Sequence, residues 1–344
     1  MTRSARRRWS TDPDFEIDGI ALAADGPVVV HGYEPPAGGK WADAVIPGKV
    51  QAYDRQTGAR IWGSPCEVGY GRGFGAGFDA QGALVILGPG QSGHRIARMS
   101  LEDGVLLGVE RVPEFDEALV GPDLCVCVGP TSISGVLTEA MTEAWRFRKE
   151  GLRFHRAARC GDEVFVAFSS KGSRTQGLLV LDALEGRFVR ELLPPNQKAI
   201  LGLSAGQQAL AMVVEDLESA LPPEAARDYM LRRLMQESGD EPMSEGPAPG
   251  LVVLSPRPGQ APLWFEDLAP APGEDELLDP TVRFDSGKLY LARGAMLDVR
   301  DALTGRELGS AVVPGLDEFV AWSVADGAFL VAEETRATVF DIPD

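Results

Sequence analysis

Acidic side chains are the residues of this chain best suited to bind a metal ion. Several of them precede short apolar segments, and this set consists of Asp116, Glu117, Asp279, Asp317 and Glu318. Carboxylate oxygens are preferred ligands of Ca²⁺, and converging carboxylates also attract cationic partner segments. The chain has a formal net charge of -18, however, so acidic residues are expected on every part of its surface. Calcium binding and plain surface charge are therefore both open interpretations.

Signatures of other chemistries are weak. The sequence contains no Gly-x-Ser-x-Gly, His-Glu-x-x-His or phosphate-loop motif. The three histidines, His31, His94 and His155, are far apart in the sequence, which gives acid–base catalysis by histidine little support. The glycine-rich segment 71–77 precedes a predicted strand and not a helix, so it does not fit a dinucleotide-binding loop. We therefore expect a protein without enzymatic activity and without a cofactor.

The cysteines indicate the compartment. They are Cys66, Cys125, Cys127 and Cys160. A strand would place the sulfurs of Cys125 and Cys127 on one face, but few histidines lie nearby to complete a zinc site, so buried free thiols in a reducing cytoplasm are favoured. The basic residues at 6–8 are not followed by a secretory signal, and no segment approaches the roughly 20 apolar residues that span a membrane. We expect a cytoplasmic protein that does not bind membranes.

The charge balance argues against a nucleic-acid partner. The chain has 33 basic and 51 acidic residues, and its only dense basic run is Arg6-Arg7-Arg8. A surface with this balance repels a phosphate backbone. The sequence therefore favours a protein as the partner.

A recurring hairpin pattern indicates how the chain positions all of these residues. An apolar strand is followed by an Asp, a tight turn that ends in Gly, and a second strand; the clearest copies are residues 52–62, 181–188 and 299–308. Tandem hairpins, with 40 glycines and 25 prolines, predict an all-β fold. We predict that residues 1–344 form one β-propeller domain of seven four-stranded blades, or of six or eight if a weak hairpin is misassigned.

The last predicted blade lacks its outer strand, because the chain ends after residues 338–341. Residues 4–10 can supply it, with Trp9 at the position that Trp62 holds in the first hairpin. This arrangement would close the ring with an N-terminal strand and remove free sheet edges.

The Asp…Thr-Gly…Trp hairpin of residues 54–62 resembles the repeats of the pyrroloquinoline-quinone-like propeller superfamily and, more loosely, WD-repeat propellers. The resemblance implies a propeller in which the tryptophan packs between neighbouring blades. In the quinone-dependent dehydrogenases, the cofactor and calcium are held by acidic and amide residues in a larger chain with a vicinal disulfide. This chain has no adjacent cysteines, so the resemblance implies the fold and not quinone chemistry. The enzymatic alternative is a calcium-dependent hydrolase, similar to lactonase propellers, that uses the acidic set.

Enlarged loops mark one face of the predicted propeller for binding. They connect the second and third strands of four blades and cover residues 31–43, 88–94, 169–176 and 215–250. Loops of this length usually carry function. We therefore expect the partner to bind on this face.

The insertion at 215–249, in the fifth blade, is predicted to contain a helix followed by a flexible tether. Apolar residues at 226, 230, 231, 234 and 235 fall on one stripe of the helix. The stripe either packs on the propeller or docks a partner, to which methionine side chains adapt well.

These features favour a non-enzymatic interaction module of bacterial type that presents a loop-decorated face to a protein partner. The candidate partner-binding residues are His31, Tyr33, Trp41, Tyr229, Met230, Leu231, Leu234 and Met235.

Overall fold

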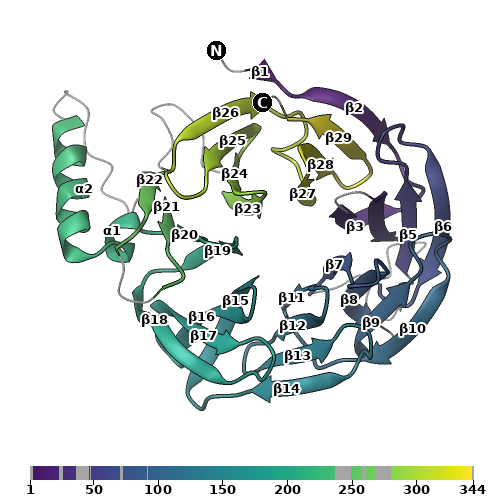
Figure 1. Cartoon of the computed structure of the whole chain (residues 1–344), viewed down its shortest axis with the longest axis horizontal. Coiled ribbons are helices and arrows are strands. Elements are labelled where there is room, and N and C mark those ends of the chain that lie inside the picture. Colours follow the sequence, from purple (N-terminus) through teal and green to yellow (C-terminus); the bar gives the residue numbers. More distant parts are fainter. Residues whose placement is uncertain are drawn as a thin grey trace.

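Seven β-sheets form a ring around a central channel in the computed structural model of this chain (Figure 1). The structure describes residues 3–22, 26–35, 46, 48–69, 73–90, 92–236, 249–257, 261–268 and 280–342. In this part of the chain, each sheet has four antiparallel strands, which follow one another in order from the channel to the rim. One sheet has a short fifth strand at its outer edge. The prediction of an all-β propeller with seven blades is confirmed.

The first six blades are built from consecutive strands. Blade 1 contains β3 (Glu16–Leu22), β4 (Val28–Tyr33), β5 (Gly48–Tyr53) and β6 (Arg60–Cys66), and blade 2 contains β7 (Gly75–Phe78), β8 (Leu84–Gly90), β9 (Gly93–Met99) and β10 (Leu106–Arg111). Blade 3 contains β11 (Glu117–Leu119), β12 (Leu124–Val128), β13 (Ile133–Leu137) and β14 (Glu143–Phe147), and blade 4 contains β15 (Leu152–Cys160), β16 (Glu163–Ser170), β17 (Gln176–Asp182) and β18 (Phe188–Gln197). Blade 5 contains β19 (Ile200–Ala205), β20 (Leu210–Val214), β21 (Gly250–Leu254) and β22 (Trp264–Asp267), and blade 6 contains β23 (Thr281–Asp285), β24 (Lys288–Arg293), β25 (Met296–Asp301) and β26 (Glu307–Val312).

Both ends of the chain build blade 7. Its inner strands are β27 (Ala321–Ala325), β28 (Ala328–Ala332) and β29 (Ala337–Asp341), and its outer strand is β2 (Arg6–Thr11). Strand β2 pairs antiparallel with β29, while β1 (Arg3–Ser4) runs parallel to β26 of blade 6. The N-terminal segment therefore covers the edge of β29 that would otherwise be free to pair with another chain.

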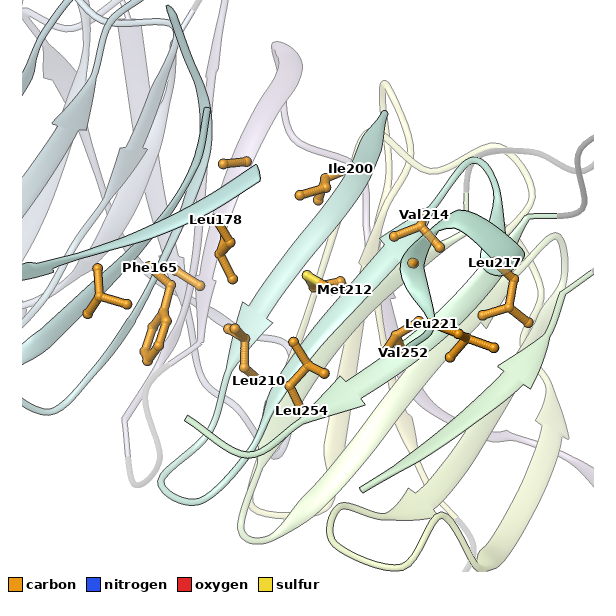
Figure 2. Packing of buried hydrophobic residues seen from close by; sticks show 14 of the residues in the cluster. Phe165, Leu178, Ile200, Leu210, Met212, Val214, Leu217, Leu221, Val252 and Leu254 are labelled. Carbon is orange, nitrogen blue, oxygen red and sulfur yellow. The ribbon is translucent and has the colours of Figure 1, made fainter. Parts of the chain in front are cut away.

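The core lies between neighbouring blades. Strands β12 and β20 have only buried side chains, because each inner strand is covered on both faces by the adjacent blades. This explains why such strands are continuous apolar runs without alternation. Figure 2 shows one of these interfaces, in which Phe165 and Leu178 of blade 4 belong to the same cluster as Leu210 and Met212 of blade 5.

Tryptophans in outer strands join four of the blades to the next one. The indole Nε1 of Trp62 in β6 donates a hydrogen bond of 2.8 Å to the carbonyl of Leu101, in the outer turn of blade 2. Its ring covers Gly104, where a Cβ atom would lie 2.5 Å from the ring and where φ is +73°. Only glycine accommodates both conditions without strain. The same contact recurs for Trp9 on Gly58, Trp145 on Gly186 and Trp264 on Gly305.

Of two loops that the sequence predicted to be enlarged, 88–94 is mostly strand and 169–176 is shortened by the strands on either side. Pro89 pairs with His94, so β8 and β9 continue almost to their turn. In blade 4, β16 and β17 leave only residues 171–175 between them. The composition of these segments suggested loops, but pairing with the neighbouring strand outweighs local propensity. Of the predicted loop 31–43, the first residues belong to β4, and 36–43 lie outside the described residues.

Candidate functional site

Among the described residues, two helices lie between β20 and β21 of blade 5. They are α1 (Leu217–Ala220) and α2 (Pro223–Gln236), and Figure 1 shows α2 at the rim, outside the ring of blades. Proline is favoured in the first turn of a helix, and Glu224 places negative charge at the positive end of the helix dipole. The predicted tether, from residue 237 to 248, lies outside the described residues.

The helix pair is anchored to blade 5. Leu217 and Leu221 are buried in the cluster between blades 4 and 5 (Figure 2). A Cβ atom at Gly250 would lie 2.6 Å from Leu217, so the missing side chain of this glycine allows α1 to approach β21. Tyr229 of α2 is also buried, and its hydroxyl donates a hydrogen bond of 2.8 Å to Asp267 of β22. Packing and hydrogen bonding therefore both hold α2 in place.

One part of α2 remains uncovered. Met230 and Leu231 are 44% and 48% exposed, although they follow the buried Tyr229 directly. Ala225, Ala226 and Tyr229 form the side that packs on the propeller. The stripe predicted from the sequence thus mixes a packed residue with two exposed ones. Leu234 and Met235 belong to α2, but the structure does not describe their side chains.

Two of the remaining candidate partner-binding residues are not on this surface. His31 and Tyr33 are buried in β4, and Trp41 lies outside the described residues. The imidazole of His31 stacks on Phe74 with ring centroids 4.7 Å apart, and its Nε2 lies 3.0 Å from the carbonyl oxygen of Val68. Burial lowers the pKa of His31 to about 4. His31 and Tyr33 are thus core residues, which corrects the expectation that they face a partner.

The acidic set is divided between separate places. Asp116 and Glu117 line a pocket of about 390 Å³ together with Arg153, His155 and Arg156. The backbone N–H of Ala157 donates a hydrogen bond of 3.2 Å to Glu117, and burial raises the pKa of this carboxyl group. The cationic neighbours make this pocket mixed in charge, which differs from the pure oxygen cage of a calcium site.

Asp317 and Glu318 do not line this pocket. Asp317 and Glu318 are exposed in the connection between β26 and β27, and Asp279 lies outside the described residues. Within the described part of the chain, no group of three or more His, Cys, Asp or Glu side chains could hold a metal ion. The described acidic candidates therefore do not come together as a calcium site of the kind that the hydrolase alternative requires.

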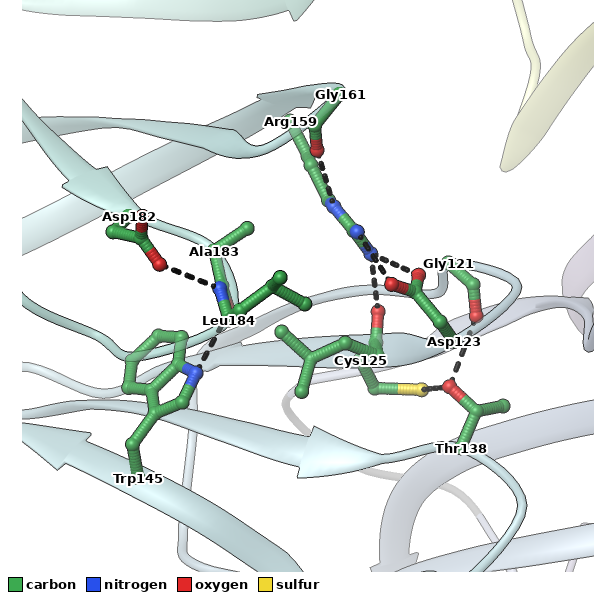
Figure 3. A network of polar contacts seen from close by, with 11 residues as sticks. Gly121, Asp123, Cys125, Thr138, Trp145, Arg159, Gly161, Asp182, Ala183 and Leu184 are labelled. Carbon is green, nitrogen blue, oxygen red and sulfur yellow. Dashed lines mark hydrogen bonds and ion pairs between the residues drawn. The ribbon is translucent and has the colours of Figure 1, made fainter.

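Polar contacts between blades 3 and 4 show how charged groups near the channel are held (Figure 3). Arg159 donates hydrogen bonds of 3.0 Å to Asp123 and to the carbonyl groups of Leu124 and Gly161. Cys125 lies 3.5 Å from the hydroxyl of Thr138. The four cysteines are free, and burial raises the pKa of the Cys125 thiol to about 11, so this sulfur is a poor nucleophile.

The central channel carries charged groups that the sequence analysis did not identify. A cavity of about 610 Å³ is lined by residues from all seven innermost strands, including Asp18 of β3 and Arg283 of β23. Burial raises the pKa of Asp18 to about 6, and its Oδ2 has no hydrogen-bond partner among the described residues. Single charged residues in a strand give no sequence signal, because only closure of the ring directs them into a common channel.

No family model and no curated protein matches this chain. Among solved structures, the chain is similar to BamB from Moraxella catarrhalis, with a TM-score of 0.50 and 15% identity over 98% of this chain and 100% of that chain. It is also similar to hydrazine synthase from Kuenenia stuttgartiensis, with a TM-score of 0.62 and 10% identity over 96% of this chain and 97% of that chain. The predicted resemblance is thereby confirmed at the level of the propeller fold, and at these identities the comparisons show the fold alone. Among the described residues, no helix is both long and apolar enough to cross a bilayer.

Proposed function

We propose that this propeller is a non-enzymatic interaction module and that the exposed side of α2 contacts a protein partner. One observation carries the proposal: α2 is fixed to blade 5 through Tyr229, yet the next two residues, Met230 and Leu231, remain about half exposed. A rigid support lowers the entropy lost on binding, and neighbouring apolar side chains supply area that a partner can bury.

The chemistry of this surface suits a protein more than a charged polymer. Met230 has an unbranched, polarizable side chain that adapts to different apolar partners. The chain's net charge of -18 disfavours a nucleic acid at any nearby surface. We also propose a reducing, cytoplasmic setting, in which the four free cysteines remain thiols.

Site-specific photo-crosslinking tests the proposal. A photoreactive amino acid is placed at Met230 of the full chain in cells that produce it, and at Leu303 as the matched control. Leu303 is also 44% exposed, but it lies in the turn between β25 and β26, on the side of the propeller opposite the connection from β20 to β21. The two positions therefore differ in location and not in exposure.

We expect a discrete adduct from position 230 that is absent from position 303 and that disappears when Leu231→Asp is added. Identical adducts from both positions would mean that any exposed apolar residue reacts. An absence of adducts from position 230 in a folded chain would contradict the proposal.

A further inference from the structure

The central channel contains a cation without a bonded partner. Arg283 extends from β23 into the cavity of about 610 Å³, where it is exposed to the lumen. Among the described residues it has no hydrogen bond and no carboxylate within 4.0 Å, unlike Arg159, which lines the same cavity and is fully engaged. The N–H donors of this guanidinium are therefore open to a ligand that enters the channel.

The surroundings of Arg283 compensate its charge only in part. Its guanidinium carbon lies 5.8 Å from the ring centroid of Trp322, a cation–π contact. The side chain is open to the lumen, yet the surrounding blades partly desolvate it and lower the pKa of Arg283, an effect that the charge of Glu117 opposes. Five N–H donors therefore remain directed at a lumen in which an anion would be stabilised.

The walls around this cation combine polar and apolar surface. The cavity is lined by aromatic and aliphatic side chains that include Ile20, Phe74, Phe78, Leu203, Phe284 and Val324. Its volume of about 610 Å³ lies within the range of small-molecule sites. A ligand for this cavity needs one anionic group and a small organic body that fits a wall of mixed polarity.

The acidic groups nearby limit the charge of that ligand. Asp18 lines the same cavity, and Glu117 is close enough to affect the pKa of Arg283. A phosphate with two negative charges is repelled by these carboxyl groups about twice as strongly as a carboxylate with one. A guanidinium binds a carboxylate through two parallel hydrogen bonds, which matches the single cation available.

We propose that the channel is a binding site for a small organic monocarboxylate, with its carboxylate on Arg283 and its organic body along the channel wall. This site is separate from the surface of α2. A partner protein and a channel ligand are therefore independent properties of the chain.

Isothermal titration calorimetry of the full chain tests this proposal with three probes of one shape. They are 3-phenylpropionate, its neutral amide 3-phenylpropanamide, and the cation 3-phenylpropylamine. We expect the carboxylate to bind at least about tenfold more tightly than the amide, as charge-assisted hydrogen bonds allow, and the amine to bind most weakly.

Variants assign the preference to its residue. Arg283→Met should abolish the difference between carboxylate and amide, and Arg283→Lys, which keeps the charge, serves if the first variant does not fold and should retain only part of it. Glu117→Gln keeps the acceptor for the N–H of Ala157 and should tighten carboxylate binding, a gain that structural damage would not produce. Arg187→Met, in an exposed outer turn, is the control and should change nothing.

Equal binding of carboxylate and amide to the wild-type chain would overturn the proposal, as would a carboxylate preference that survives in Arg283→Met. If no probe binds to the folded chain, the channel contains only water and the proposal is wrong. Leu231→Asp should leave all of these affinities unchanged.

Discussion

Replacing Trp62 by alanine should destabilise the propeller more than most single substitutions. Trp62 is 8% exposed and donates its indole hydrogen bond to the carbonyl of Leu101 in the next blade. A tryptophan buries about 150–250 Å² of surface, which corresponds to about 4–6 kcal/mol at roughly 25 cal/mol per Å², as an upper estimate. Partial collapse of the cavity reduces this figure, so we expect a loss of about 3–5 kcal/mol in the free energy of unfolding.

Urea denaturation followed by circular dichroism measures this loss, with Ile61→Ala as the matched control. Ile61 is the preceding residue of β6 and is 52% exposed, so its truncation should change stability by less than about 0.5 kcal/mol. Gly104→Ala disrupts the same contact from the glycine side and should also destabilise the fold, because the added methyl group would overlap the indole ring. In the Trp62→Ala background, Gly104→Ala should lower the free energy of unfolding by less than it does in the wild type, because the indole ring is no longer there to be overlapped. Equal denaturation midpoints for Trp62→Ala and Ile61→Ala would refute this account of blade-to-blade contact.

Three further predictions concern pH, ring closure and calcium. Because the folded pKa of His31 is lowered from 6.5 to about 4, the unfolded chain gains a proton first as pH falls; the stability of the wild type relative to His31→Gln should therefore decrease by up to about 3 kcal/mol from pH 6.5 to 4, and a difference constant with pH would contradict this. Removal of residues 1–11 exposes the edge of β29, so the truncated chain should melt earlier and self-associate in sedimentation experiments; a monomer of full thermal stability would show that β2 is dispensable. A chelator should not change the melting temperature; a melting temperature that falls with chelator, is restored by calcium and loses this sensitivity in Asp116→Ala would support the hydrolase alternative instead.

The fold was predictable because its signals are local. In the hairpin at 52–62, Asp54 accepts a hydrogen bond of 2.7 Å from the backbone N–H of Thr57, and Gly58 adopts a positive φ. Both requirements act within one turn, so residue types alone reveal them. Each blade repeats the same four-stranded unit, which allowed the ring to be counted before any long-range contact was known.

The site was harder to predict because burial depends on residues that are distant in sequence. His31 follows a valine run and precedes a glycine, a context that resembled the start of a loop, but Phe74 of the next blade covers it. The stripe on α2 was assigned from helical spacing alone, whereas the hydrogen bond from Tyr229 to Asp267 determines which side of α2 faces the propeller. Arg283 gave no signal, since its role arises only when seven strands enclose one channel.

The most direct test of the interaction proposal is the affinity of the protein partner recovered by crosslinking from position 230. Its dissociation constant is measured for the wild-type chain, for Leu231→Asp and for Leu303→Asp, in which the same charge is placed at a residue of comparable exposure. Burying an unpaired carboxylate in an apolar contact is costly, so we predict at least a tenfold loss of affinity for Leu231→Asp and no loss for Leu303→Asp. Equal affinities for all three chains, or a loss confined to Leu303→Asp, would contradict the assignment of the binding surface to α2.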